Sequence, residues 1–175
     1  MTSEFSREVD IKHVPQKGQN LREQASEAEC AALALRYKIE GMKSFELEVD
    51  IVKWKKSALR AKGKVKAVLE RECVVSLDVF EQAVEESFSV LLLPEHMMQS
   101  DDISNPDANS DFEREDEELL VDGKADIGEL AVQMLSLGID PHPRKPDASF
   151  AYEESATDDG DADNPFNVLK SLKDS

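Results

Sequence analysis

The chain has 175 residues, of which 40% are hydrophobic and 34% charged, and its formal net charge is −17. This length allows one modest core with a large solvated surface, so we expect one domain accompanied by disordered segments. The amino terminus lacks a basic cluster followed by an apolar stretch, and the longest strongly apolar run is Val90 to Leu93. We therefore expect no secretory signal and no membrane span, and a cytoplasmic protein.

Charge is unevenly distributed along the chain. Residues 1–94 hold 15 Lys and Arg against 16 Asp and Glu, whereas residues 95–175 hold 6 against 22. An acidic second half repels phosphate backbones. Any direct contact with nucleic acid is therefore expected from the first half.

The amino-terminal part predicts a short strand and then a helix. Phe5 to Ile11 alternates weakly, as in a strand, and Pro15 with Gly18 marks a turn. Ser26 and Glu29 form a capping box at the start of an Ala- and Leu-rich run, which predicts a helix over residues 27–38. The residues expected on its core-facing stripe are Ala28, Ala32 and Leu35, with Cys30 and Leu33 beside them and Gly41 ending the segment.

Two strands with rows of opposite charge are predicted next. From Ser44 the sequence alternates with a period of two, residues 54–57 offer a hairpin connection, and residues 59–69 alternate again. The residues expected on the apolar face are Phe45, Leu47, Val49 and Ile51 in the first strand and Ala61, Gly63, Val65, Ala67 and Leu69 in the second. The other face carries Glu46, Glu48 and Asp50 in the first strand and Arg60, Lys62, Lys64 and Lys66 in the second.

The four cations of the second strand allow two interpretations. If the strands pair antiparallel, the acidic row lies across from the basic row, and the opposite charges stabilise the register. We favour this structural interpretation. Alternatively, the cations bind nucleic-acid phosphates, which requires that their face stays unpaired and open.

A third long strand and a shorter one are predicted to follow. Phe80, Val84, Phe88, Val90 and Leu92 recur at even spacing, with Glu81, Glu85, Ser87 and Ser89 facing water, and an antiparallel meander is the simplest topology. Residues 97–116 lack periodicity and predict a flexible acidic excursion. Leu119 and Val121 then predict a short strand that ends at the turn dipeptide Asp122-Gly123.

A second helix completes the predicted domain. Asp126 and Glu129 form another capping signature, and Gly138 followed by Pro141 ends the segment. The apolar residues at helical spacing are Ile127, Leu130, Ala131, Met134 and Leu135. The fold class is therefore expected to be α+β, with an antiparallel meander sheet and with an amino-terminal and a carboxyl-terminal helix packed on it, over residues 1–150.

Residues 151–175 predict an acidic disordered tail with a short terminal helix. Few large apolar residues separate the acids, and Pro165 suits the first turn of a helix. Phe166, Leu169 and Leu172 would line one face of that helix. This face either docks a partner protein or folds back on the chain's own domain.

The sequence offers little support for catalysis. His13, His96 and His142 have no recognisable nucleophile nearby in the sequence, and no phosphate-cradling glycine motif is present. Cys30 and Cys73 are too far apart in sequence for a disulfide framework or a metal-ligand pair at useful spacing. We therefore expect no enzyme activity, cofactor, metal or small-molecule substrate.

Several segments together resemble the YceD family of large ribosomal RNA subunit accumulation proteins. Residues 27–34 resemble its amino-terminal helix, and residues 72–80 resemble its central cysteine strand. Residues 125–131 with 140–146 are similar to its D-I/L-x-E-L helix and proline-rich exit, and residues 164–172 resemble the carboxyl end of alphaproteobacterial members. Many members have C-x-R-C-L where this chain has Cys73-Val74-Val75-Ser76-Leu77, so a thiol-pair metal site is not expected, and Cys73 is expected to be packed and inert.

The resemblance implies a role in ribosome biogenesis, namely accumulation of 23S rRNA for the large ribosomal subunit, with no catalytic residues to carry over. The expected partner is a ribosomal protein or a large-subunit rRNA precursor, since an acidic chain suits basic ribosomal proteins. Direct binding of rRNA through Arg60, Lys62, Lys64 and Lys66 is a second mechanism within the same role. The alternative hypothesis is a general acidic adaptor that presents the carboxyl-terminal helix to another protein.

Overall fold

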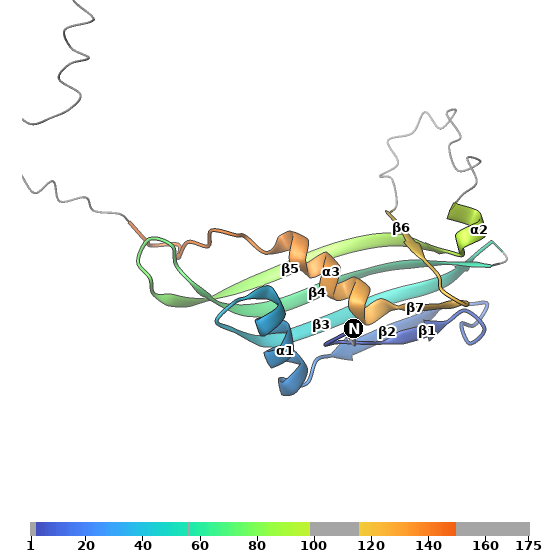
Figure 1. The fold of residues 1–175 in the computed structure, drawn as a ribbon, viewed down its shortest axis with the longest axis horizontal. Coiled ribbons are helices and arrows are strands. Elements are labelled where there is room, and N and C mark those ends of the chain that lie inside the picture. Colours follow the sequence, from blue (N-terminus) through green and yellow to red (C-terminus); the bar gives the residue numbers. More distant parts are fainter. Residues whose placement is uncertain (1–2, 56, 99–115, 150–175) are drawn as a thin grey trace, which may run out of the picture.

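A computed structural model describes residues 3–55, 57–98 and 116–149, which form a long curved sheet with two helices on one of its faces (Figure 1). The helices are α1 (Glu27–Tyr37), α2 (Glu95–Met98) and α3 (Ile127–Gly138). The strands are β1 (Glu8–Asp10), β2 (Gln19–Gln24), β3 (Gly41–Trp54), β4 (Ala58–Glu72), β5 (Val79–Leu93), β6 (Asp116–Leu119) and β7 (Lys124–Asp126).

The main sheet has five strands in the order β2-β3-β4-β5-β6, and β1 pairs with β7 in a separate two-stranded sheet. Strands β2 to β5 are antiparallel neighbours, as expected for a meander, but β6 runs parallel to β5. The expectation of a wholly antiparallel sheet was therefore wrong at this edge. A parallel neighbour needs a long crossover, and the 22 residues between Leu93 and Asp116 provide one.

The segments predicted between the strands have mixed outcomes. The expected hairpin connection at residues 54–57 lies between β3 and β4, with residue 56 outside the described residues. Of the expected excursion, Met97 and Met98 lie in α2 and Asp116 begins β6, while residues 99–115 lie outside the described residues. The predicted strand at Leu119 begins three residues earlier, and Val121 forms an isolated bridge with Lys124 across the predicted Asp122-Gly123 turn.

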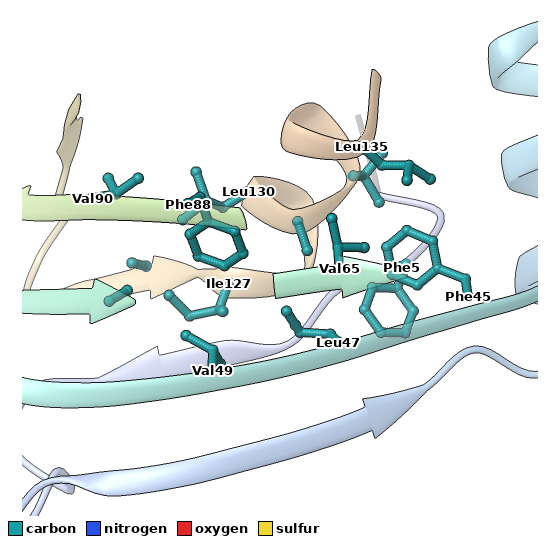
Figure 2. Close-up of a cluster of buried hydrophobic side chains, with 14 of the residues drawn as sticks. Phe5, Phe45, Leu47, Val49, Val65, Phe88, Val90, Ile127, Leu130 and Leu135 are labelled. Atoms are coloured by element: carbon teal, nitrogen blue, oxygen red, sulfur yellow. The ribbon is translucent and has the colours of Figure 1, made fainter. Parts of the chain in front are cut away.

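One hydrophobic core fills the space between the sheet and the helices. The inward face of the sheet contributes the alternating residues that the sequence predicts, among them Leu47, Val49 and Val65, all of which are almost fully buried. Figure 2 shows Ile127 and Leu130 of α3 pointing into this layer. Because each fully buried aliphatic side chain contributes about 1.5–3 kcal/mol, this layer is the main source of stability.

Helix α1 begins as predicted but turns a different face to the core. Ser26 and Glu29 form the reciprocal capping box, in which the serine hydroxyl accepts from the Glu29 N–H and the glutamate accepts from the Ser26 N–H. The buried residues are Cys30, Leu33 and Ala34, whereas Leu35 is 81% exposed, so the predicted stripe was wrong. The observed stripe also brings Tyr37 to α3, where its hydroxyl donates to the Val132 carbonyl at 2.7 Å.

The amino-terminal segment is part of the core rather than an appendage. The Phe5 ring lies 4.8 Å from the Phe45 ring, and the Ile127 N–H at the start of α3 donates to the Arg7 carbonyl at 3.0 Å. A side chain at Gly128 would collide with the Phe5 carbonyl oxygen, so glycine permits this close crossing. The predicted strand from Phe5 to Ile11 is accordingly shortened to β1, which pairs with β7.

An ion-pair network joins the two helices at their exposed rim. The Arg36 guanidinium of α1 contacts Glu129 of α3 at 2.6 Å and Glu4 at 2.8 Å. Hydrogen bonding from Arg36, supported by Ser3 and Gln133, lowers the pKa of Glu129 to about 2, although partial burial opposes this shift. The carboxylate thereby links the amino terminus to both helices.

The lowered pKa of Glu129 predicts an acid-sensitive contact between the helices. Because its pKa in the folded state lies below the usual 4.5, its contribution is fully present above pH 4.5 and is lost as the pH falls toward about 2. The wild type should therefore lose stability more steeply over this range than Glu129→Gln does. Chemical denaturation at a series of pH values measures this difference, and parallel curves for the two proteins would contradict it.

Candidate interaction surface

The face of the main sheet opposite the helices, here called the outer face, carries ordered rows of charge. On β3 the acidic row is Glu46, Glu48 and Asp50, and on β4 the basic row is Arg60, Lys62, Lys64 and Lys66. The observed register pairs Glu46 with Lys66, Glu48 with Lys64 and Asp50 with Lys62. The predicted antiparallel match of opposite charges is thus confirmed.

Several side chains of these rows make close contacts with neighbouring strands. Lys66 lies 2.8 Å from Glu85 of β5, and Lys64 lies 3.9 Å from Glu48. Glu48 also receives Arg22 of β2 at 2.6 Å, so its carboxylate is shared by two cations. Hydrogen bonding with Glu85 raises the pKa of Lys66, and the same contact lowers the pKa of Glu85.

The basic row meets one of the two conditions set for phosphate binding. Its cations are exposed or half-buried, and both α1 and α3 pack on the opposite face, so the row is open to solvent within the described part of the chain. The second condition, that the row stays unpaired, is not met, because Lys64 and Lys66 contact carboxylates. Lys62 has no ion pair among the described residues. Exposed pairs of this kind contribute little stability and exchange partners readily. Phosphate binding by the four cations therefore stays a prediction.

Residues 73–78 form a tight connection, here called the hairpin tip, rather than the strand expected over residues 72–80. The Leu77 N–H donates to the Cys73 carbonyl at 2.9 Å, and Leu77 adopts a left-handed backbone conformation with φ of 61°. The chain after α3 runs beside the tip (Figure 1), where the Val74 N–H donates to the Pro143 carbonyl at 3.0 Å. Alternation along the sequence does not reveal this turn, because local hydrogen bonds within residues 73–78 close it and the bond to Pro143 comes from a segment distant in sequence.

The Cys73 side chain is fully buried at the tip, as expected, but its surroundings are polar. Its sulfur accepts backbone N–H groups from Val75, Ser76 and Lys145 at 3.4–3.5 Å. The Ser76 hydroxyl, followed by the backbone N–H groups of Lys145 and Ser76, lowers the pKa of the Cys73 thiol to about 6 against the opposing effect of burial. In contrast, burial raises the pKa of Cys30, with Glu29 and Glu27 adding to the effect. Cys73 is thus packed as predicted, and the donors around its sulfur favour the thiolate.

The remaining candidates from the sequence do not converge. His13, His96 and His142 are all exposed, and among the described residues no three His, Cys, Asp or Glu side chains gather in a metal-binding group. Two open hollows have volumes of about 410 and 540 Å³, and exposed charged side chains line them in part, Lys12 in the first and Lys124 in the second. Phe166, Leu169 and Leu172 lie outside the described residues. The outer face and the hairpin tip are therefore the surfaces that the fold presents.

Comparison with known proteins identifies the family. The sequence model described as large ribosomal RNA subunit accumulation protein YceD matches residues 61–173. The chain belongs to the YceD family. Neither the curated proteins nor the solved structures contain a significant match to this YceD chain. In the described residues of this YceD protein, no helix is both long enough and apolar enough to span a membrane.

The match places much of the candidate surface within the part that this YceD protein shares with its family. It begins inside β4 and contains Lys62, Lys64 and Lys66, the hairpin tip and α3. It leaves out α1 and β3, which complete the same core. The family's description implies a role in accumulation of the large ribosomal subunit RNA.

The two cysteines are expected to titrate in separate pH ranges. In Cys30→Ala, where only Cys73 remains, thiolate absorbance at 240 nm should rise at lower pH than in Cys73→Ala, where only Cys30 remains. The physical reason is the set of hydrogen-bond donors around Cys73, whereas at Cys30 burial outweighs the backbone hydrogen bond from Phe45. Coincident titration curves would show that the donors do not stabilise the thiolate, and circular dichroism checks that both variants stay folded.

Proposed function

We propose that this protein is a non-catalytic factor that promotes 23S rRNA accumulation and large-subunit biogenesis in the cytoplasm. It does so by binding a ribosomal protein or an rRNA–protein intermediate. The observation that carries the proposal is the YceD family match over residues 61–173, which contains most of the basic row and all of α3.

The outer face supports binding to a partner that carries both signs of charge. A row of carboxylates on β3 lies beside a row of cations on β4, and the pleat of the sheet fixes their spacing. Arg22 of β2 and Glu85 of β5 add one further charge on either side. An rRNA–protein intermediate exposes phosphates beside basic side chains, which is the complementary pattern. The paired cations can exchange a carboxylate for a phosphate with little loss, because exposed ion pairs are weak.

The overall charge supports a basic protein as part of that partner. The described residues hold 17 Lys and Arg against 25 Asp and Glu, and the other residues hold 4 against 13. A negative field of this size accelerates encounter with basic proteins and slows encounter with bare RNA. Binding of rRNA alone is therefore less favoured than binding of a basic protein. Any contact of Lys62 and Lys64 with phosphates would be confined to the basic row.

The role of the basic row is tested by reversing two of its charges. In a strain that lacks the gene, Lys62→Glu with Lys64→Glu should support less mature 23S rRNA than the wild type, because the acidic row and two new acids would repel phosphates. The matched control is Lys12→Glu with Lys17→Glu, which reverses two exposed lysines away from the outer face. Northern blots quantify 23S rRNA and its precursor.

A second pair of variants separates binding from folding. Lys62→Gln with Lys64→Gln removes the charges without adding repulsion against Glu48 or Asp50, and its unfolding temperature is measured beside that of the wild type. If this variant folds normally and restores 23S rRNA fully, the basic row does not bind rRNA. If the gene's deletion leaves 23S rRNA unchanged, the proposed role itself is rejected.

Salt dependence of rRNA recovery with purified protein should weaken when both lysines are neutralised.

A further inference from the structure

We infer that the hairpin tip docks a basic segment with an apolar face, belonging to a protein of the large ribosomal subunit. This inference rests on the proposed function and names the kind of partner and the surface that binds it. The surface consists of three apolar side chains at the end of the β4–β5 hairpin. They are Val74, Leu77 and Val79.

These three side chains are exposed although smaller polar residues would satisfy the turn. Val74 is 46% exposed, Leu77 68% and Val79 57%, and all three lie within six consecutive residues. Single exposed apolar residues are common on protein surfaces, but a cluster at a protruding turn is typical of an interaction site. Figure 1 shows the turn projecting at the far end of the sheet, beyond α1 and α3.

The backbone of the tip is held rigidly in a conformation that leucine does not favour. Leu77 has a φ of 61°, a backbone conformation that asparagine or glycine adopts more easily than leucine does. The Cys73 N–H donates to the Asp78 carbonyl at 2.9 Å, closing the turn across its base. A leucine held exposed under strain indicates that its side chain is needed for contact rather than for folding.

The segment after α3 fixes the position of the tip. Arg71, only 7% exposed, donates to the Asp140 carbonyl at 2.8 Å, and Lys145 contacts Asp78 at 3.5 Å. The Val74 N–H also donates to the Pro143 carbonyl, and the Lys145 N–H donates to the Cys73 sulfur. Together these contacts attach the hairpin tip to the segment after α3. The apolar side chains are thereby presented in one arrangement, which reduces the entropy lost on binding.

Charge around the tip favours a basic protein segment over RNA. Residues 70–81 and 140–147 contain six acids and three cations, and one of these cations, Arg71, is buried against the backbone. Glu70 and Glu81 contact Lys43, and Asp78 contacts Lys145. In these two segments the acids without an ion pair among the described residues are Glu72, Asp140 and Asp147, against the exposed cation Arg144. The rim therefore keeps a negative balance of charge. Such a rim repels phosphates and attracts Lys and Arg beside an apolar anchor.

Site-specific crosslinking of the full-length protein tests this assignment. A photoreactive benzoylphenylalanine replaces Val79, and two probes are offered separately: the protein mixture extracted from salt-washed large subunits, and deproteinised 23S rRNA. We expect a crosslink to a basic protein of the mixture. Adding Leu77→Asn should reduce its yield about tenfold, as expected for an apolar anchor at the centre of an interface.

Two controls separate binding from folding in this experiment. Leu77→Asn relieves the left-handed strain, so its unfolding temperature should equal or exceed that of the wild type. Leu35→Gln removes an exposed leucine of α1 and should leave the crosslink unchanged. If Leu77→Asn has wild-type stability, a loss of crosslink yield in this variant is caused by the missing apolar contact.

Each other outcome overturns the inference. No crosslink, a yield that Leu77→Asn leaves unchanged, a crosslink only to 23S rRNA, or one to a second copy of this chain would each reject the assigned partner. These failures are distinct from failure of the proposed function. Suppose that Leu77→Asn gives the same crosslink yield as the protein without this substitution, while the wild-type gene still restores 23S rRNA in the deletion strain. The role in biogenesis is then kept, and the hairpin tip has no part in it.

Discussion

The register between β3 and β4 is the constraint on which the rest of the structure depends. Side chains alternate across a strand, so a slip of one residue would turn Leu47 and Val65 to solvent and the charged rows toward the helices. Burial of the apolar row determines the register, since each aliphatic side chain contributes far more than an exposed ion pair. The opposite charges on the outer face agree with this register and reinforce it. The candidate interaction surface is thus a by-product of how the core is built.

The same alternation explains why the outer face can be rigid without being inert. Its charges belong to strands whose backbones are fixed by ladders on both sides, while the long lysine and arginine side chains retain freedom at their ends. A charged and ordered surface suits a partner assembled from RNA and protein. The hairpin tip is different in character, because local turn hydrogen bonds and bonds to a remote segment together fix its shape, and its exposed groups are apolar. The fold therefore offers two chemically distinct surfaces at separate places.

Strong periodicity made β3, β4, β5 and α3 predictable from the sequence, because their apolar faces are continuous over many residues. Strand β2 was missed, since Gln19 to Gln24 contains one large apolar residue and an edge strand needs little burial. The face of α1 was misjudged because its alanines fit either stripe, and only contact with Tyr37 and α3 decides between them. The parallel edge and the tip could not be predicted, because both depend on residues distant in sequence. The match of acidic and basic rows could be predicted because it follows from alternation within two neighbouring strands. The exposure of Leu77 could not, because alternation does not report the turn in which it lies.

The family match begins at residue 61, three residues inside β4, but the hydrophobic core contains residues on both sides of that boundary. Phe5, Phe45 and Leu33 all precede it and are buried against residues that follow it. A fragment starting at the boundary would leave the edge of β4 that pairs with β3 without its neighbouring strand and would be prone to self-association. The first 60 residues of this chain therefore belong to the same packed unit as the matched part, because they supply part of the hydrophobic core that also holds residues of β4 and β5.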